Sequence, residues 1–166
     1  QDNMSALFTL QHNNFVNDLL VDNVKNYYLT ASNDKTIKIW NRDNGNLISA
    51  KSFDRPIVKL WFDSKKDTVY SIGQYSKFFY KWNLTTDVVE KVILLDGPGV
   101  IFSVDFDFNN RQIVMSRVQF GGGRKGLFIK DLDTLETVAG KYTRGGKVKF
   151  IDKGKHFLRG LTEVYD

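Results

Sequence analysis

Apolar and polar residues alternate along many short segments of this chain, and polar turns separate these segments. The clearest example is "TIKIWN", residues 36–41, which follows the polar stretch "SNDK". On an extended strand, Ile37 and Ile39 point to one side, while Lys38 and Trp40 point to the other. No segment has a convincing helical period of 3.6 residues, so the pattern predicts an all-β chain.

The same frame returns several times along the sequence. Trp40-Asn41 and Trp82-Asn83 are 42 residues apart. A strand, a polar turn and a second apolar strand can be read in residues 15–32, 57–73, 101–117 and 147–160. A third strand then closes each segment as "TIKIWN", "FFYKWN", "LFIKDL" or "TEVYD", and a short outer strand follows the first three. A period of ~40–45 residues with four short strands is typical of β-propeller blades.

The repeat divides the whole chain, residues 1–166, into propeller blades. The approximate repeats are residues 7–41, 42–83, 84–131 and 132–166. Propellers have ~4–8 blades, so three arrangements fit. We favour a fragment of a larger propeller; a half-propeller completed by another chain and a closed four-bladed ring are the alternatives. An open half-propeller would expose apolar blade faces and favour association.

One stretch carries a family resemblance. "ASNDKTIKIWN", residues 31–41, resembles the end of a Trp-Asp (WD) repeat, and Gln11-His12 stands where that family usually has Gly-His. The third repeat has Lys130-Asp131 at the Trp-Asp position. The resemblance implies a WD-repeat β-propeller, which usually has about seven blades within the general range of propellers.

The resemblance also places His12, Ser32, Asp34 and Trp40 in one hydrogen-bonded group. A buried indole N–H needs an acceptor, and we expect the Ser32 hydroxyl to accept it and to donate onward to His12. Asp34, in the turn, is expected to hold the imidazole ring. His, Ser and Asp together also suggest a hydrolase, which we reject because Trp40 shares their frame and the second repeat lacks the His and the turn Asp. The predicted role of the group is structural.

Other motifs do not predict chemistry. The glycine-rich "GGGRKG", residues 121–126, lacks the Gly-Lys-Ser/Thr ending of a phosphate loop and is expected to be a hairpin tip. The only histidines are His12 and His156, and there is no cysteine, so we expect no metal site, no cofactor and no catalytic residues. The sequence has no long uncharged apolar run, so we expect no membrane span. The composition agrees with an intracellular protein, cytoplasmic or nuclear.

Function is therefore expected on a surface. In propellers, the loops that join outer to inner strands and second to third strands gather at one rim. The candidate partner-binding rim comprises Asn14, Arg55, Tyr75, Lys77, Arg117, Gln119, Arg124, Lys125 and Arg144. Arg and Tyr are favoured at binding hot spots, and with a net charge of +5 an acidic or phosphorylated peptide would suit this rim.

The leading hypothesis is a non-catalytic scaffold that binds protein or peptide partners within a multiprotein complex. Two alternatives stay open. One is a nucleic-acid-associated propeller subunit whose basic rim contacts RNA or DNA phosphates. The other is a propeller enzyme whose active site lies outside this chain. Further blades or another chain are expected to close the propeller.

Overall fold

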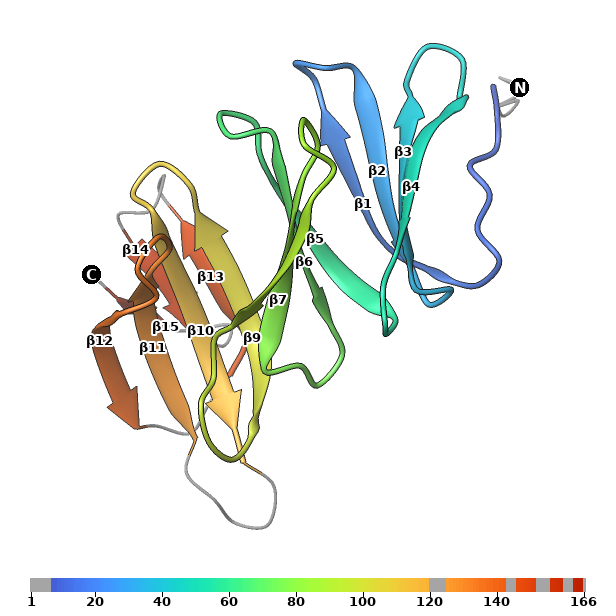
Figure 1. Cartoon of the computed structure of the whole chain (residues 1–166). Coiled ribbons are helices and arrows are strands. Elements are labelled where there is room, and N and C mark those ends of the chain that lie inside the picture. The colour runs from blue at the N-terminus through green and yellow to red at the C-terminus, as the bar shows by residue number, and fades with distance from the viewer. Residues whose placement is uncertain (1–6, 120–124, 143–145, 152–155, 160–162, 166) are drawn as a thin grey trace, which may run out of the picture. The chain divides into compact units, whose positions relative to one another are not determined.

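The computed structural model describes residues 7–119, 125–142, 146–151, 156–159 and 163–165. Within these ranges the regular secondary structure consists of β-strands, arranged as small antiparallel sheets (Figure 1). The first sheet contains β1 (Val16–Asp22), β2 (Tyr27–Ser32), β3 (Thr36–Asn41) and β4 (Leu47–Ser52). The second contains β5 (Ile57–Asp63), β6 (Thr68–Gly73), β7 (Phe78–Asn83) and β8 (Val89–Ile93). The predicted all-β propeller architecture is confirmed in its secondary structure.

The third and fourth sheets follow the same plan. The third contains β9 (Val100–Asp107), β10 (Gln112–Val118), β11 (Gly126–Asp131) and β12 (Thr137–Tyr142). The fourth contains β13 (Val148–Ile151), β14 (His156–Arg159) and β15 (Glu163–Tyr165). Strands pair in chain order within every sheet. The sequence repeat and the sheet are staggered, because the repeat at residues 42–83 supplies β4 to the first sheet and β5 to β7 to the second.

Buried aspartates close the turn between the first two strands in three of the sheets. Asp22, Asp63 and Asp107 are all buried. Each carboxylate accepts hydrogen bonds from the backbone N–H groups two and three residues further on. This side-chain cap satisfies turn amides that have no strand partner, which is why aspartate suits the position.

The residue after the repeated tryptophan has a similar use. Asn41 and Asn83 accept from the N–H groups two and three residues later, and Asp131 does the same in the third sheet. The "WN" pair and the third repeat's "KD" pair are therefore the end of the third strand plus the cap of the turn into the outer strand. The internal repeat predicts that these pairs are equivalent, and their hydrogen bonds are equivalent.

Leu135, in the turn after Asp131, provides a test of local strain. Its φ is +62°, a conformation in which an L-residue costs roughly 1–2 kcal/mol and glycine costs little. The equivalent turn of the first sheet has Gly45, with a φ of +71°. We expect Leu135→Gly to raise the free energy of urea unfolding by up to about 1 kcal/mol. Glu136→Gly, at a neighbouring position without a positive φ, should lower it instead; a loss of stability in Leu135→Gly would contradict the strain argument.

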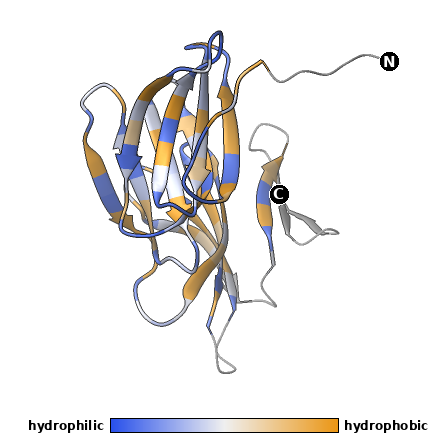
Figure 2. Ribbon diagram, turned by 90° about the vertical axis from the view of Figure 1, so that its right-hand side faces the viewer, coloured by the Kyte–Doolittle hydropathy of each residue, from blue (hydrophilic) through white to orange (hydrophobic). Residues whose placement is uncertain are grey.

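The chain divides into two compact units. The N-terminal unit comprises residues 1–74 and 79–91, and the C-terminal unit comprises residues 75–78 and 92–166. Each unit has its own buried apolar residues. Figure 2 colours the apolar positions along the strands orange and the polar positions blue. The N-terminal unit buries Leu29, Ile37, Ile57, Val69 and Trp82, and the C-terminal unit buries Ile113, Val114, Met115, Leu127 and Val148.

In the N-terminal unit, the first strands of the two sheets lie against each other through polar groups as well as apolar ones. Asp18 Oδ2 accepts a hydrogen bond from the backbone N–H of Leu60 at 2.8 Å. Asp18 Oδ1 forms an ion pair with Lys59 Nζ at 3.0 Å. The Asn17 amide donates to the carbonyl of Ile57 at 2.7 Å. These bonds fix the register between neighbouring sheets, which apolar contact alone would leave free to slide.

The C-terminal unit uses the same device with other residues. The backbone N–H of Val148, in β13, donates to Ser103 Oγ at 3.1 Å, and that of Phe150 donates to Asp105 Oδ2 at 2.8 Å. Polar side chains on a first strand therefore bind the first-strand backbone of the next sheet in both units. In the stretch "DFDFNN", residues 105–110, Asp105 thus has a packing role, whereas Asp107 closes a turn.

Candidate partner-binding surface

His12 lies at the centre of a polar group on the first sheet. Its Nδ1 is 2.9 Å from Asp34 Oδ2 and its Nε2 is 2.6 Å from Thr30 Oγ1. The Trp40 indole donates to the same Thr30 oxygen at 2.8 Å. Thr36 Oγ1 donates to Asp34 Oδ1 at 2.6 Å and lies 3.1 Å from His12 Nδ1. Trp40, Thr30, His12 and Asp34 thus form one continuous chain of hydrogen bonds.

Thr30, and not Ser32, links Trp40 to His12, which corrects the expectation from the sequence. Ser32 instead donates to the carbonyl of Asn14 at 3.2 Å and accepts from the backbone N–H of Asp34 at 3.0 Å. Ser32 therefore ties the N-terminal segment to the turn. Thr30 and Ser32 are two residues apart on one strand face, so alternation could not choose between them.

The side-chain donors and acceptors of His12 and Asp34, which a catalytic trio would need, are already bonded to neighbours. The side chains of His12 and Asp34 are only 1% and 8% exposed. A single hydrogen placement satisfies the chain: Trp40 donates to Thr30, Thr30 donates to His12 Nε2, and His12 Nδ1 donates to Asp34. Burial opposes ionisation of Asp34, but hydrogen bonds from Thr36, Asn13 and His12 outweigh it and hold the pKa of Asp34 well below its usual value.

The second sheet fills the same position differently. Asp54 follows His12 by 42 residues, the interval that separates the two tryptophans. It accepts a hydrogen bond from the hydroxyl of Tyr80. The hydrogen bond from Tyr80 is the main cause that lowers the pKa of Asp54 to about 2, against the opposing effect of burial. Burial, and then the bond to Asp54, raises the pKa of Tyr80 to about 12.

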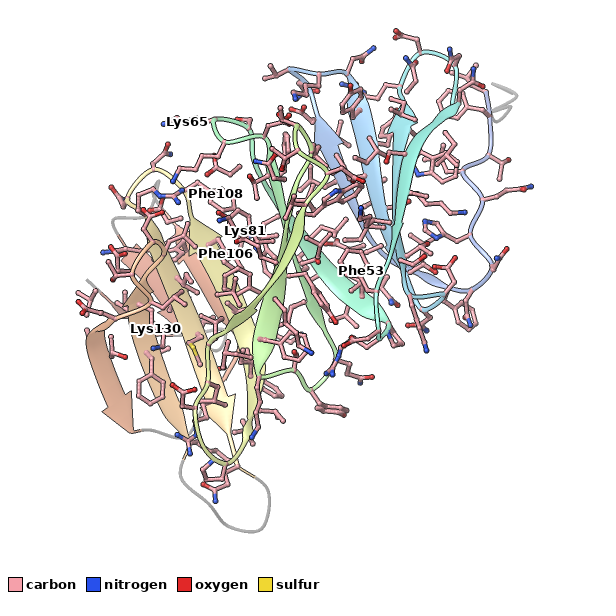
Figure 3. All side chains as sticks on the ribbon, viewed as in Figure 1. Phe53, Lys65, Lys81, Phe106, Phe108 and Lys130 are labelled. Atoms are coloured by element: carbon pink, nitrogen blue, oxygen red, sulfur yellow. The ribbon has the colours of Figure 1, made fainter. Side chains whose placement is uncertain are left out.

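The Trp82 indole has its own acceptor in this sheet, Asp87 Oδ1 at 2.9 Å. Phe53, labelled in Figure 3 on the segment after β4, packs on the ring of Tyr80 with 4.7 Å between ring centroids. The second repeat therefore lacks the histidine yet keeps a polar link at the equivalent place, between the exposed carboxylate of Asp54 and the hydroxyl of Tyr80. The 42-residue interval was the sequence signal that could have identified Asp54.

The predicted rim residues fall into both compact units. Asn14 precedes β1, and Arg55 lies between β4 and β5, both in the N-terminal unit. Arg55 pairs with Asp54 at 3.2 Å and lies against Gly73, where a Cβ would come within 2.5 Å of the arginine Cδ. Glycine at residue 73 thus makes room for the arginine side chain.

The other described rim residues are in the C-terminal unit: Tyr75, Lys77, Arg117, Gln119 and Lys125. Arg124 and Arg144 lie outside the described residues. The described part of the predicted rim is therefore divided between the two units, with Tyr75, Lys77, Arg117, Gln119 and Lys125 together in the C-terminal one.

Two hydrogen bonds hold together the described rim residues of the C-terminal unit. The Ser76 carbonyl accepts from the N–H of Ile101 at 2.9 Å, and Lys77 Nζ donates to the carbonyl of Gly97 at 2.7 Å. The β6–β7 turn is thereby fixed to the segment before β9. Strand register sets Arg117 opposite Ile101, and Lys125 lies one residue before the start of β11.

We name the C-terminal rim as the four cations at this end of the third sheet, Lys77, Arg117, Lys125 and Lys147. Among the described residues, none of the four forms an ion pair. Elsewhere in the described chain many cations are paired, for example Lys25 with Asp67 and Arg111 with Asp133. The C-terminal rim therefore gathers four cations without a counter-ion among the described residues, a property it shares with single cations such as Lys35, Lys38 and Lys149.

Other kinds of site find no support in the described ranges. No group of three or more His, Cys, Asp or Glu side chains is placed to hold a metal ion there. Over the same residues, no helix has the length and apolarity required to cross a membrane.

Comparison with known proteins supports the fold. No protein-family model and no curated protein matches the chain. The β-propeller domain of Cps50 (Swd1) from Myceliophteria thermophila superposes with a TM-score of 0.70 at 12% identity, covering 90% of this chain and 50% of that one. The computationally designed Ika4 protein superposes with a TM-score of 0.68 at 18% identity, covering 98% of each chain.

These likenesses identify the class of protein as a β-propeller, and at such identities they show the fold alone. The chain spans half the length of the Cps50 propeller domain. The expectation that further blades or another chain complete the propeller stays a prediction.

Proposed function

We propose that this chain is a non-catalytic scaffold of the WD-repeat type, which binds protein partners through the loops at the C-terminal rim and works within a multiprotein complex. The observation that carries this proposal is the set of cations at the C-terminal rim that have no described counter-ion. Their charge is available to a partner, because forming an external ion pair would break no internal one.

The hydrogen bonds of the polar side chains around His12 support a scaffold role more than an enzymatic one. The trio that most suggests hydrolysis, His12, Ser32 and Asp34, is divided between two structural tasks and has its donors and acceptors occupied by neighbours. A nucleophile also needs access to substrate, and Ser32 is buried. The WD-repeat assignment is supported by the His12, Asp34 and Trp40 group and by the fold.

The proposal can be tested by affinity capture from cell extract with the wild-type chain and with the double variant Lys77→Glu, Lys125→Glu. We expect proteins that co-purify in fixed ratio with the wild type, resist nuclease treatment, and bind the variant at least about tenfold more weakly. The control is Lys65→Glu with Lys66→Glu, on the β5–β6 turn at the other end of the second sheet, which should retain the partners.

Nuclease-sensitive capture would instead favour the nucleic-acid-associated alternative, and steep salt dependence would accompany it. Partners retained equally by both double variants would show that the C-terminal rim is not the binding surface. Turnover of small esters or phosphates by the purified chain would favour the enzyme alternative.

A further inference from the structure

The β1 side of the first sheet leaves apolar side chains open to solvent. Leu19 is 53% exposed and Val21 is 45% exposed. They pair in register with Thr30 and Tyr28 of β2, so the four side chains share one face of the sheet. Residues 8–12 contact the two β2 residues on this face. The β1 pair stays open, and apolar side chains gathered on an open sheet face are typical of a contact surface.

Strand register identifies the equivalent position in other sheets. Counted back from the turn between the first two strands, Leu60 of β5 and Val148 of β13 are equivalent to Leu19. Leu60 is 2% exposed and Val148 is 6% exposed. Each of these two residues belongs to a sheet that follows another sheet of the same unit. The position is therefore covered where a preceding sheet is described beside it.

A backbone hydrogen bond accompanies this contact in both units. The N–H of Leu60 donates to Asp18 Oδ2 at 2.8 Å, and the N–H of Val148 donates to Ser103 Oγ at 3.1 Å. Asp18 and Ser103 occupy equivalent positions in β1 and β9. By the same register the N–H of Leu19 points away from β2, and no side chain among the described residues accepts from it. Such an edge N–H can receive an acceptor from another strand.

We propose that the β1 side of the first sheet, defined by Leu19, Val21 and the backbone N–H of Leu19, docks a further antiparallel sheet supplied by a partner polypeptide. The first strand of that sheet carries an acidic or hydroxyl side chain at the position of Asp18 and Ser103. A sheet is named as the occupant because the contact would repeat the one by which β1 receives β5. The surface belongs to the N-terminal unit, so the inference does not depend on the C-terminal rim.

The charges of the fourth sheet argue against a second copy of this chain as the occupant. The acceptor position of Asp18 and Ser103 is taken by Lys147 in the fourth sheet. Lys149 stands where the third sheet has Asp105, which accepts from the next sheet. Both lysines are exposed, and an ammonium group only donates hydrogen bonds. The first strand of the fourth sheet therefore offers no side-chain acceptor at these two positions, which disfavours head-to-tail association of two copies.

Amide hydrogen exchange of the wild-type chain, followed residue by residue by NMR, tests the state of the Leu19 N–H. We expect it to exchange at least about tenfold faster than the N–H of Leu60, because Leu60 donates to Asp18. Equal protection of the two amides would overturn the inference, since the N–H of Leu19 would then already have an acceptor.

A second test gives the chain the chemistry expected of the partner. The double variant Lys147→Ser, Lys149→Asp copies Ser103 and Asp105 of the third sheet onto the fourth, so one copy becomes the probe for the first sheet of another. Sedimentation velocity should show self-association at least about tenfold tighter than in the wild type. Adding Leu19→Lys should return the association to the wild-type level, because lysine removes the apolar contact.

Val24 provides a matched control for Leu19→Lys. It is an 82% exposed apolar residue of the β1–β2 turn. Val24→Lys adds the same charge to the same sheet and should leave the association of the double variant unchanged. Because Leu19 and Val24 are both exposed, neither substitution should prevent folding.

Three results would overturn the inference. The first is a double variant that associates no more tightly than the wild type, and the second is an association that Leu19→Lys does not weaken. The third is self-association of the wild type that Leu19→Lys abolishes, which would identify a second copy as the occupant. The capture experiment with Lys77 and Lys125 would still judge the scaffold proposal separately.

Discussion

Replacing Asp34 by asparagine is expected to lower the free energy of unfolding by about 1.5–3 kcal/mol at pH 7. Both carboxylate oxygens are used: Oδ1 accepts from the N–H and hydroxyl of Thr36, and Oδ2 accepts from His12 and from the N–H of Asn13. An amide placed here must turn its NH2 group toward two donors in either orientation. The substitution therefore removes acceptors and adds a repulsive contact while the side-chain volume stays the same.

The effect should depend on pH in a defined direction. The folded-state pKa of Asp34 lies below the ordinary value of 3.8, so the carboxylate contributes its full stabilisation above that value. The contribution is lost as the pH falls below 3.8 toward the lower, folded-state pKa. The pKa values of Asp54, Asp87 and Asp131 are also lowered, so the wild type itself should lose stability in acid.

Urea unfolding of wild type and Asp34→Asn between pH 3 and pH 8 would measure both effects. The difference between the two proteins should be largest at neutral pH and should narrow in acid. The control is Asp43→Asn, in the exposed turn after β3, which should differ little from wild type over the whole range. A constant difference at all pH values would show that the charge of Asp34 is not the source of its contribution.

The strand frame could be predicted from the sequence because strand alternation and turn chemistry are local properties. "TIKIWN" places Ile37 and Ile39 inside, and both are buried. The aspartates and asparagines that close the turns act on amides only two and three residues away. Such features depend on a few neighbouring residues, so one sequence is enough to reveal them.

Contacts across strands and across sheets are a different case. The acceptor for Trp40 depends on the register of β2 against β3, where Tyr28 lies opposite Trp40 and Thr30 opposite Lys38. Sequence alternation does not determine that register, so Ser32 was predicted in place of Thr30. The close approach of the Gly99 backbone to Arg117 depends on the positive φ of Gly99, and periodicity carries no information about such a pair.

Thr30→Val tests the link that the sequence did not reveal. Valine nearly matches threonine in shape but cannot accept from Trp40 Nε1 or donate to His12 Nε2, and the site is buried. Each group left without a partner costs about 1–3 kcal/mol. Two groups lose their partner, so we expect the free energy of unfolding of the variant to be at least about 2 kcal/mol lower than that of wild type. Thr9→Val, the same substitution on the exposed segment before β1, should change stability little.

The double variant Thr30→Val, Asp34→Asn then shows whether the hydrogen bonds act as one group. His12 is bonded to both sites. Once the Thr30 hydroxyl is removed, the His12 ring is held less firmly, so the hydrogen bond from His12 to Asp34 contributes less to stability. The two losses should therefore sum to more than the loss of the double variant, with a coupling of about 0.5–3 kcal/mol. Simple additivity would mean that Trp40–Thr30 and His12–Asp34 are independent contacts, and the structural explanation for the histidine at residue 12 would then have to be abandoned.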